Sequence, residues 1–164
     1  LGEVRHDLKT PVGHILGYAE MLAEEFEDEP WYEFTEDLKH IHLSGNRLLE
    51  LIEEFLGASK KSVLEIDFTN AQYQLRLQLN HISGYCDMLR ELAEDEDRSD
   101  LLPDLDHIAQ ASVNFTQIVE DKLKPSSLEV SDLKSNDDKT SNSSDLSNQS
   151  KTEKNTKLDK EINL

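Results

Sequence analysis

GHILGYAEMLAEEFEDE, residues 13–29, returns as NHISGYCDMLRELAEDE, residues 80–96, and this repeat decides the fold. The shift that carries residue 13 onto residue 80, the repeat offset, also superimposes the later stretch DLKHI on DLDHI without a gap. Between residues 3–56 and 70–123 the 54 aligned pairs include 17 identities, which is far above chance. The chain is therefore expected to contain the same structural unit twice.

Each repeat has the hydrophobic pattern of two helices. Apolar or small residues recur at alternating steps of four and three, which is typical of the seam between helices in a bundle. In the first repeat these positions are Leu8, Val12, Ile15, Ala19, Leu22 and Phe26, then Phe34, Leu38, Ile41, Gly45, Leu48, Ile52 and Phe55. In the second they are Leu75, Leu79, Ile82, Cys86, Leu89 and Ala93, then Leu101, Leu105, Ile108, Ser112, Phe115 and Val119. Acidic turns separate the two helices of each repeat, and no β pattern of comparable length is present.

We predict an all-α fold in which two antiparallel helical hairpins, residues 1–57 and 68–124, pack as a four-helix bundle. Residues 58–67 form the linker. A lone hairpin of about 55 residues buries too little surface, whereas two hairpins share one core. The pairing is either intramolecular, as a pseudo-dimer, or between two chains, as a homodimer. Residues 125–164 are rich in Ser, Asn, Asp and Lys, and we expect them to be a disordered tail.

Charge and composition exclude several classes of function. The formal net charge of −18 argues against nucleic acid and against anionic membrane surfaces as partners, because both attract basic proteins. No apolar run approaches the roughly 20 residues of a membrane span, and no signal peptide is apparent, so a cytoplasmic location is expected. The single cysteine, Cys86, excludes an internal disulfide and a cysteine-based zinc cage. No metal site is predicted, since His40 and His42 would point apart on a helix.

The segment RHDLKTP, residues 5–11, carries the candidate chemistry. With Leu8 in the seam, His6 lies on the solvent side, where the lone pair of a neutral imidazole is available as a nucleophile. Asp7 follows directly and can hydrogen-bond the ring, and Thr10 shares the face of His6 one turn later. Pro11 removes a helix hydrogen bond and kinks the chain.

A plainer interpretation of the same residues is open. Thr10 could be an N-cap with Pro11 at the first helical position, which would leave His6 in a frayed and inactive lead-in. The apolar stripe continues upstream through Leu1 and Val4, which favours a helix that already includes His6. A helix present at the first residue also suggests that the sequence is a piece of a longer protein.

HDLKTPVGHILGYAEML resembles the H-box of bacterial sensor histidine kinases, within their dimerisation and histidine-phosphotransfer domain. That family's pattern is a histidine, an acidic residue, two further residues, Thr or Asn, and Pro, followed by an amphipathic helix. The resemblance covers about residues 1–57. It implies that His6 is the phosphoacceptor, that Asp7 is the base or orienting group, and that Thr10 positions a water for dephosphorylation. It also implies a receiver (response regulator) domain as partner.

The second repeat departs from this motif. At the positions of the histidine, the acidic residue, the threonine and the proline it carries Tyr73, Gln74, Leu77 and Gln78. It therefore resembles a phosphoacceptor hairpin whose site has been erased. We predict one histidine site in the module, which exchanges a phosphoryl group within a two-component phosphorelay. The alternative is a non-phosphorylated dimerisation or coupling scaffold of a larger signalling protein.

The phosphoryl donor is expected to be separate from this sequence. The six glycines form no GxG and no phosphate-binding loop. We therefore expect no cofactor on this chain and no autonomous kinase activity. ATP and Mg²⁺ would act only through a separate histidine kinase ATP-binding domain.

Overall fold

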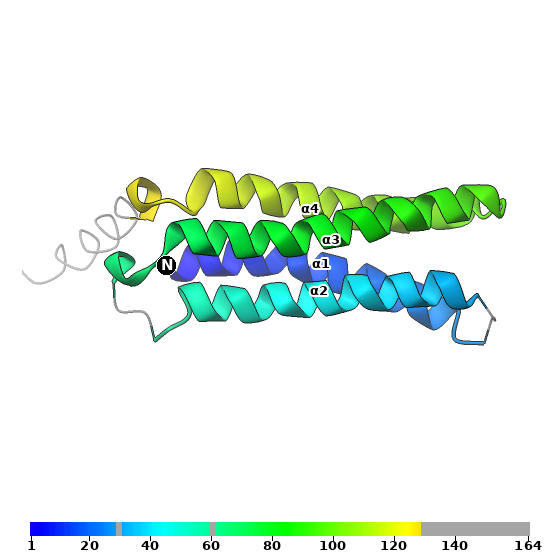
Figure 1. Cartoon of the computed structure of the whole chain (residues 1–164), viewed down its shortest axis with the longest axis horizontal. Helices are drawn as coiled ribbons and strands as arrows, with labels where there is room; N and C mark the ends of the chain where they lie inside the picture. Colours follow the sequence, from blue (N-terminus) through cyan, green and yellow to red (C-terminus); the bar gives the residue numbers. More distant parts are fainter. Residues whose placement is uncertain (29–30, 60–61, 129–164) are drawn as a thin grey trace, which may run out of the picture. The chain divides into compact units, whose positions relative to one another are not determined.

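Four long helices lie side by side in the computed structural model of the chain (Figure 1). The structure describes residues 1–28, 31–59 and 62–128. Helix α1 spans Gly2–Glu25, α2 spans Tyr32–Leu56, α3 spans Phe68–Asp95 and α4 spans Leu102–Lys122. Two short 3₁₀ turns, η1 (Val63–Glu65) and η2 (Ser99–Leu101), precede α3 and α4. Within these ranges no strand is present, and the predicted all-helical fold is confirmed.

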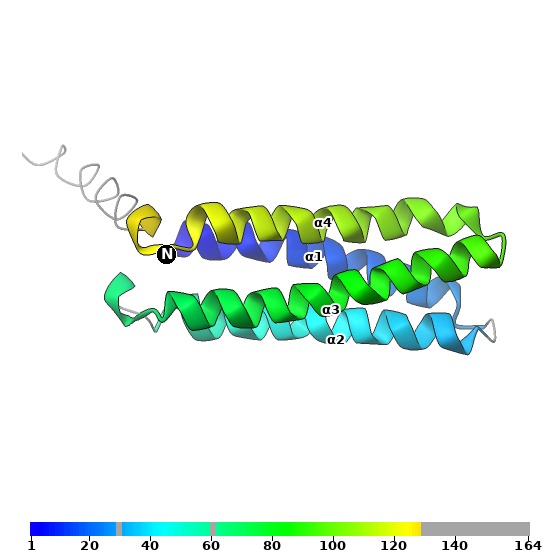
Figure 2. The ribbon, with the colours of Figure 1, turned by 45° about the horizontal axis from the view of Figure 1, so that its top comes forward.

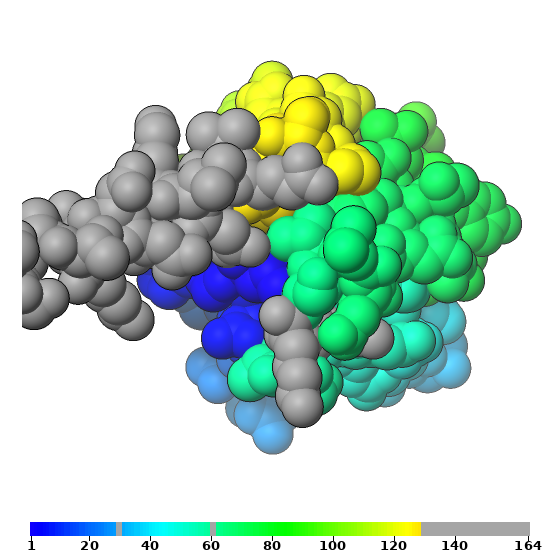
Figure 3. Space-filling model, turned by 90° about the vertical axis from the view of Figure 1, so that its left-hand side faces the viewer, coloured from blue at the N-terminus to red at the C-terminus, as the bar shows by residue number. Residues whose placement is uncertain are grey.

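The helices alternate in direction, so that α1 and α2 form one hairpin and α3 and α4 form another (Figures 1 and 2). Helix α1 packs against α2 and α4, and α3 packs against the same two helices. The starts of α1 and α3 and the ends of α2 and α4 therefore meet at one end of the bundle, which Figure 3 views directly. No helix of the described ranges combines the length and the apolar composition that crossing a membrane requires.

The core is built from the four predicted stripes. Every apolar stripe residue is buried, and most are completely inaccessible to solvent. Gly45 and Ser112, the two small stripe positions, are buried as well. Burial of one large apolar side chain contributes about 1.5–3 kcal/mol, which explains why the 3.6-residue periodicity sets the face that each helix turns inward.

Local sequence accounts for several helix ends. Asp67 caps α3, because its carboxylate accepts a hydrogen bond of 3.0 Å from the backbone N–H of Asn70. Pro103 lies in the first turn of α4, where its missing N–H costs nothing. Gly57 follows the last residue of α2, and a Cβ added there would come within 3.0 Å of the backbone carbonyl oxygen of Glu53. A glycine is therefore required at that position.

Three kinds of contact occur twice in the bundle, at positions related by the repeat offset. A side-chain N–H donates to the carbonyl oxygen of a leucine at the end of a hairpin, a cation near the start of a hairpin pairs with a glutamate near its end, and a tyrosine stacks on a histidine. The pairs are Arg5–Leu56 and Gln72–Leu123, Lys9–Glu53 and Arg76–Glu120, and Tyr18–His107 and Tyr85–His40. The two hairpins thus use equivalent positions for equivalent contacts.

The region after α4 differs from the expectation. Residues 125–128 form one further helical turn, and Leu128 is fully buried in the common core. The prediction of disorder from residue 125 onward is therefore wrong for its first four residues, because Leu128 finds apolar surface to cover. The remainder of the predicted tail, residues 129–164, lies outside the described residues.

Candidate functional site

The predicted nucleophile lies on the outer face of α1. Val4 and Leu8 on either side of it are buried, and helical geometry turns the residue midway between them away from the core. The side chain of His6 is 81% exposed. A second macromolecule can therefore reach the imidazole without any rearrangement of the bundle.

Helix α1 passes through Pro11 without a break, from Gly2 to Glu25. The plainer hypothesis, in which Thr10 caps a helix that starts at Pro11, is therefore wrong. Pro11 is buried and has no N–H to donate to the carbonyl oxygen of Asp7 one turn earlier. The Thr10 hydroxyl instead donates to the carbonyl oxygen of His6 over 3.2 Å, a local bond that often accompanies a bend in a helix.

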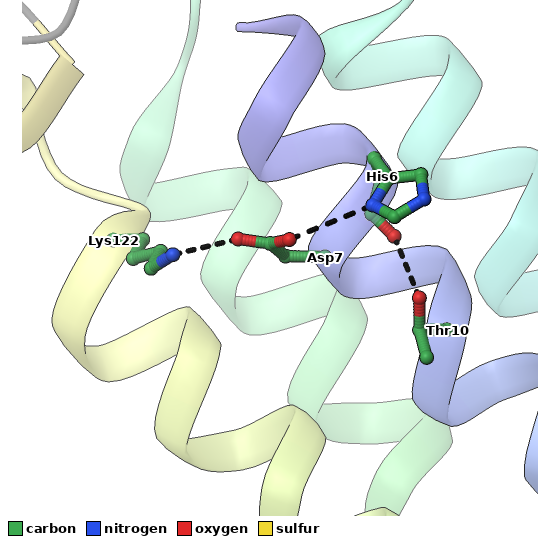
Figure 4. Close-up of polar contacts among 4 residues, drawn as sticks. All are labelled: His6, Asp7, Thr10 and Lys122. Carbon is green, nitrogen blue, oxygen red and sulfur yellow. Dashed lines mark hydrogen bonds and ion pairs between the residues drawn. The ribbon is translucent and has the colours of Figure 1, made fainter.

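Asp7 lies between a histidine and a lysine from opposite sides (Figure 4). Its Oδ1 is 3.6 Å from Nδ1 of His6, which is slightly longer than a hydrogen bond and corresponds to an electrostatic contact. Its Oδ2 accepts a hydrogen bond of 2.6 Å from Nζ of Lys122 on α4. Figure 4 also shows that the other ring nitrogen, Nε2, points away from Asp7.

The electrostatics of this pair keep both groups charged. The Lys122 ammonium holds the pKa of Asp7 below its ordinary value, with a smaller contribution from the His6 ring and partial opposition from burial. The carboxylate in turn raises the pKa of Lys122. Asp7 is 29% exposed and Lys122 43% exposed, so solvent screens the interaction in part. Asp7 is therefore an anion beside the imidazole throughout the neutral pH range.

A second ion pair holds the other side of the same helical turn. Lys9 pairs with Glu53 on α2, while Arg5 donates to the carbonyl oxygen of Leu56 over 3.3 Å. The histidine therefore projects from a turn of α1 that is tied to α2 on one flank and to α4 on the other. This arrangement presents an oriented imidazole on a rigid element.

Comparison with known families supports a chemical identity for this segment. Residues 1–62 match the His Kinase A (phospho-acceptor) domain. The match includes the whole first hairpin, so this segment is similar to the phosphoacceptor domain of histidine kinases. No curated protein and no solved structure matches the chain.

Two hollows open on the surface of the bundle beside α1. One, of about 370 Å³, lies between α1 and α4 and is bordered by Asp7, Thr10, His14 and Lys122. The other, of about 490 Å³, lies between α1 and α2 and includes His42, whose Nε2 is 2.9 Å from a carboxylate oxygen of Glu20. Only the smaller hollow touches residues of the histidine motif, so it is the one next to the chemistry.

The other histidines and Cys86 lie at positions that fit a structural role. His42 is half-buried, and the other histidines outside the motif are exposed, namely His14, His40, His81 and His107. Among the described residues no group of three His, Cys, Asp or Glu side chains is placed to hold a metal ion. Cys86 is buried, its Sγ contacts the carbonyl oxygen of Leu105 at 3.3 Å, and burial raises the pKa of the thiol to about 11. A reactive thiol is thus disfavoured.

The tyrosines of the repeat have a role that sequence reasoning missed. Their recurrence beside Gly17 and Gly84 is compatible in sequence with close helix packing, but a Cβ at either glycine would meet no atom within 4 Å. Instead Tyr18 stacks on a histidine of α4, and its repeat equivalent stacks on a histidine of α2. The signal was present in the sequence, because the tyrosine and the histidine recur together at the same offset.

Lys122 is the second residue that sequence reasoning missed. It lies far from Asp7 in the chain, in the repeat that has no histidine motif. Neither its spacing nor its neighbours single it out from other surface lysines. Only the packing of α4 against α1 brings it to the site.

Proposed function

We propose that the first hairpin is the histidine phosphoacceptor module of a two-component phosphorelay, in which His6 exchanges a phosphoryl group with a receiver or kinase domain. The observation that carries this proposal is the orientation of the ring. Nδ1 faces a carboxylate that is charged at neutral pH, and Nε2 points away from that carboxylate on a side chain that is 81% exposed (Figure 4). A carboxylate beside Nδ1 favours the tautomer with its proton there, which leaves the lone pair on the exposed nitrogen.

The transfer step follows from this geometry. Nε2 of neutral His6 attacks the phosphorus of an acyl phosphate on a receiver aspartate, and an N–P bond forms while the P–O bond to the aspartate breaks. The aspartate carboxylate leaves with the electron pair of that bond. The ring becomes a phosphorylated imidazolium, whose positive charge Asp7 stabilises until the Nδ1 proton passes to Asp7 or to water. The reverse sequence delivers the phosphoryl group from His6 to the receiver.

Thr10 has a separate role in this proposal. Its hydroxyl lies one turn from His6 on the same exposed face and borders the hollow between α1 and α4. A hydroxyl there can orient a water molecule that attacks a phosphohistidine or a docked acyl phosphate. Thr10 would then set the rate of dephosphorylation. ATP and Mg²⁺ enter through a separate kinase domain, and this chain binds no cofactor of its own.

We further propose that the second hairpin is a copy of the first without its site, and that it completes the bundle as an intramolecular pseudo-dimer. Support comes from the three contacts that recur at the repeat offset. In a homodimer the partner chain supplies the second hairpin, whereas here the same chain carries both. Light scattering after size-exclusion chromatography should then give the monomer mass of 18.8 kDa. A stable mass of twice that value would contradict the intramolecular pairing.

Phosphoryl transfer is tested by incubating the chain with a receiver domain that has been labelled with ³²P-acetyl phosphate. We expect acid-labile label on the wild-type chain and on His81→Gln, which changes an exposed histidine on α3 away from the hollow beside the motif. The His6→Gln variant should take up none. Equal labelling of the two variants would place the acceptor elsewhere. The experiment is repeated with an active histidine kinase domain as a second phosphoryl donor. If none of the proteins takes up label from either donor, the alternative of a non-phosphorylated scaffold is correct.

A further inference from the structure

The contact between Asp7 and Lys122 joins the two hairpins at the histidine motif. Lys122 is the last residue of α4, and its ammonium donates to Oδ2, the carboxylate oxygen that does not face the imidazole. The other oxygen is thereby left toward Nδ1 of His6 (Figure 4). A carboxylate held at one oxygen by a charge-assisted hydrogen bond loses much of its freedom to rotate.

This contact has no equivalent in the other half of the bundle. Under the repeat offset, Asp7 corresponds to Gln74 and Lys122 corresponds to Phe55. Phe55 is buried at 8% exposure and carries no charge. A symmetric pair of first hairpins would therefore offer Asp7 a phenylalanine at this position. Of the two equivalent positions, 55 and 122, only the one that faces the intact motif carries a cation.

We propose that Lys122 is a positioning residue of the histidine site, contributed by the second hairpin, which holds the Asp7 carboxylate against the Nδ1 side of His6. The inference rests on the proposed phosphoacceptor function of His6 and assigns the second hairpin a part in it. Lys122 acts through Asp7 and does not touch the imidazole. The second hairpin is then a component of the site as well as a packing partner.

The charges around the pair are compatible with this role. On α1 the neighbouring titratable groups are Glu3 and His6, and on α4 the neighbour is Asp121. The carboxylates of Glu3 and Asp121 also interact electrostatically with Lys122, but neither forms the 2.6 Å contact that Asp7 makes. The lysine is thus directed to one carboxylate among several.

The test compares the full chain with a small set of variants. Lys122→Met removes the ammonium group, and Lys122→Arg keeps a positive charge. As a control, Lys124→Met removes an exposed lysine two positions away and changes the net charge by the same amount as Lys122→Met. Asp7→Asn, alone and with Lys122→Met, shows whether the lysine acts through the carboxylate. The readouts are the ¹⁵N chemical shifts of the His6 ring, which report where its proton resides, and the rate of labelling from the phosphorylated receiver.

We expect Lys122→Met to move the His6 ring shifts toward the Nε2–H tautomer and to slow labelling by on the order of 10-fold, because the orienting carboxylate is no longer held. Lys122→Arg should restore most of both, and Lys124→Met should match the wild type. In the Asp7→Asn background the lysine substitution should have no further effect. If Lys122→Met behaves like Lys124→Met, or if its effect persists without Asp7, the inference is wrong.

The two proposals fail in different ways. The ring shifts are measured without any phosphoryl donor, so they test the positioning role by themselves. Altered shifts in a chain that never accepts label would support the positioning of His6 and contradict the phosphoacceptor function. Normal labelling with unaltered shifts would support the phosphoacceptor function and overturn the role of Lys122.

Discussion

The stacked tyrosine–histidine pairs allow the pairing of the two hairpins to be measured. The rings of Tyr18 and His107 are 4.6 Å apart between centroids and inclined by 13°, and those of Tyr85 and His40 are 4.6 Å apart and inclined by 9°. Aromatic pairs in this range couple by about 0.5–1.5 kcal/mol. Because both histidines are exposed, we expect the lower half of that range, about 0.5–1 kcal/mol for each pair.

The perturbation is a double-mutant cycle to alanine for each pair. Coupling of Tyr18 with His107 and of Tyr85 with His40 should be equal within about 0.3 kcal/mol, since the two contacts are equivalent. The decisive third cycle combines Tyr18 with His40. These two residues do not contact each other in the bundle, because Tyr18 stacks on His107 and His40 stacks on Tyr85. A homodimer of two first hairpins would bring Tyr18 onto His40 of a second copy. Intramolecular pairing therefore predicts no coupling in this cycle.

The assay is urea denaturation at pH 8, where an ordinary imidazole is neutral, followed by far-ultraviolet circular dichroism. Coincident transitions from Trp31 fluorescence would establish two-state behaviour. Unfolding midpoints should not depend on protein concentration. A coupling between Tyr18 and His40 as large as that of a stacked aromatic pair, about 0.5 kcal/mol or more, would refute the pairing that we describe. The absence of coupling in either stacked pair would refute it as well.

Two further predictions concern stability. Gly57→Ala should destabilise the bundle by about 1–3 kcal/mol, because the added Cβ would collide with the backbone carbonyl of Glu53. Gly84→Ala should instead stabilise the bundle by about 0.5–1 kcal/mol, because no atom lies within 4 Å of the added Cβ and alanine favours a helix over glycine. Urea midpoints measure both, and equal effects of the two substitutions would contradict the contact at Gly57. Since Lys122 lowers the pKa of Asp7, the pair should stabilise the fold fully above the ordinary value of 3.8 and lose its effect as pH falls through the lower folded value. The gap in stability between the wild type and Lys122→Met should be below about 1 kcal/mol at pH 6 and should shrink as the pH falls below 3.8. A gap that does not shrink in acid would rule out Asp7 as the partner.

The fold was predictable because its signal is repeated. Seam positions such as Leu8 and Leu75 recur at the same offset in two copies, so accidental periodicity in one copy is filtered out by the other. The position of His6 outside the core followed from the same seam. The start of α1 was harder to predict, because Thr10 and Pro11 also fit the first residues of a helix. The burial of Val4 in the core shows that the helix begins earlier.

Other features were beyond the reach of sequence patterns. Leu128 looks like one isolated leucine in a polar tail, and its burial depends on contact with the core of the bundle, which no local pattern reveals. The recurrence of Tyr18 and His40 in both copies was visible, but it did not state which ring meets which. A shared offset marks equivalent positions and carries no information on contacts between them.

The amino-acid sequence alone determined four amphipathic helices, the residues of their seams, and an imidazole that faces solvent beside an acidic residue. These properties follow from periodicity within one helix, where each residue's direction is set by its neighbours three and four positions away. The tertiary structure alone decided that Lys122 meets Asp7 and that tyrosines of one hairpin stack on histidines of the other. Such contacts depend on the rotation and axial register of one helix against another, which are set by the packing of the whole core rather than by any local pattern.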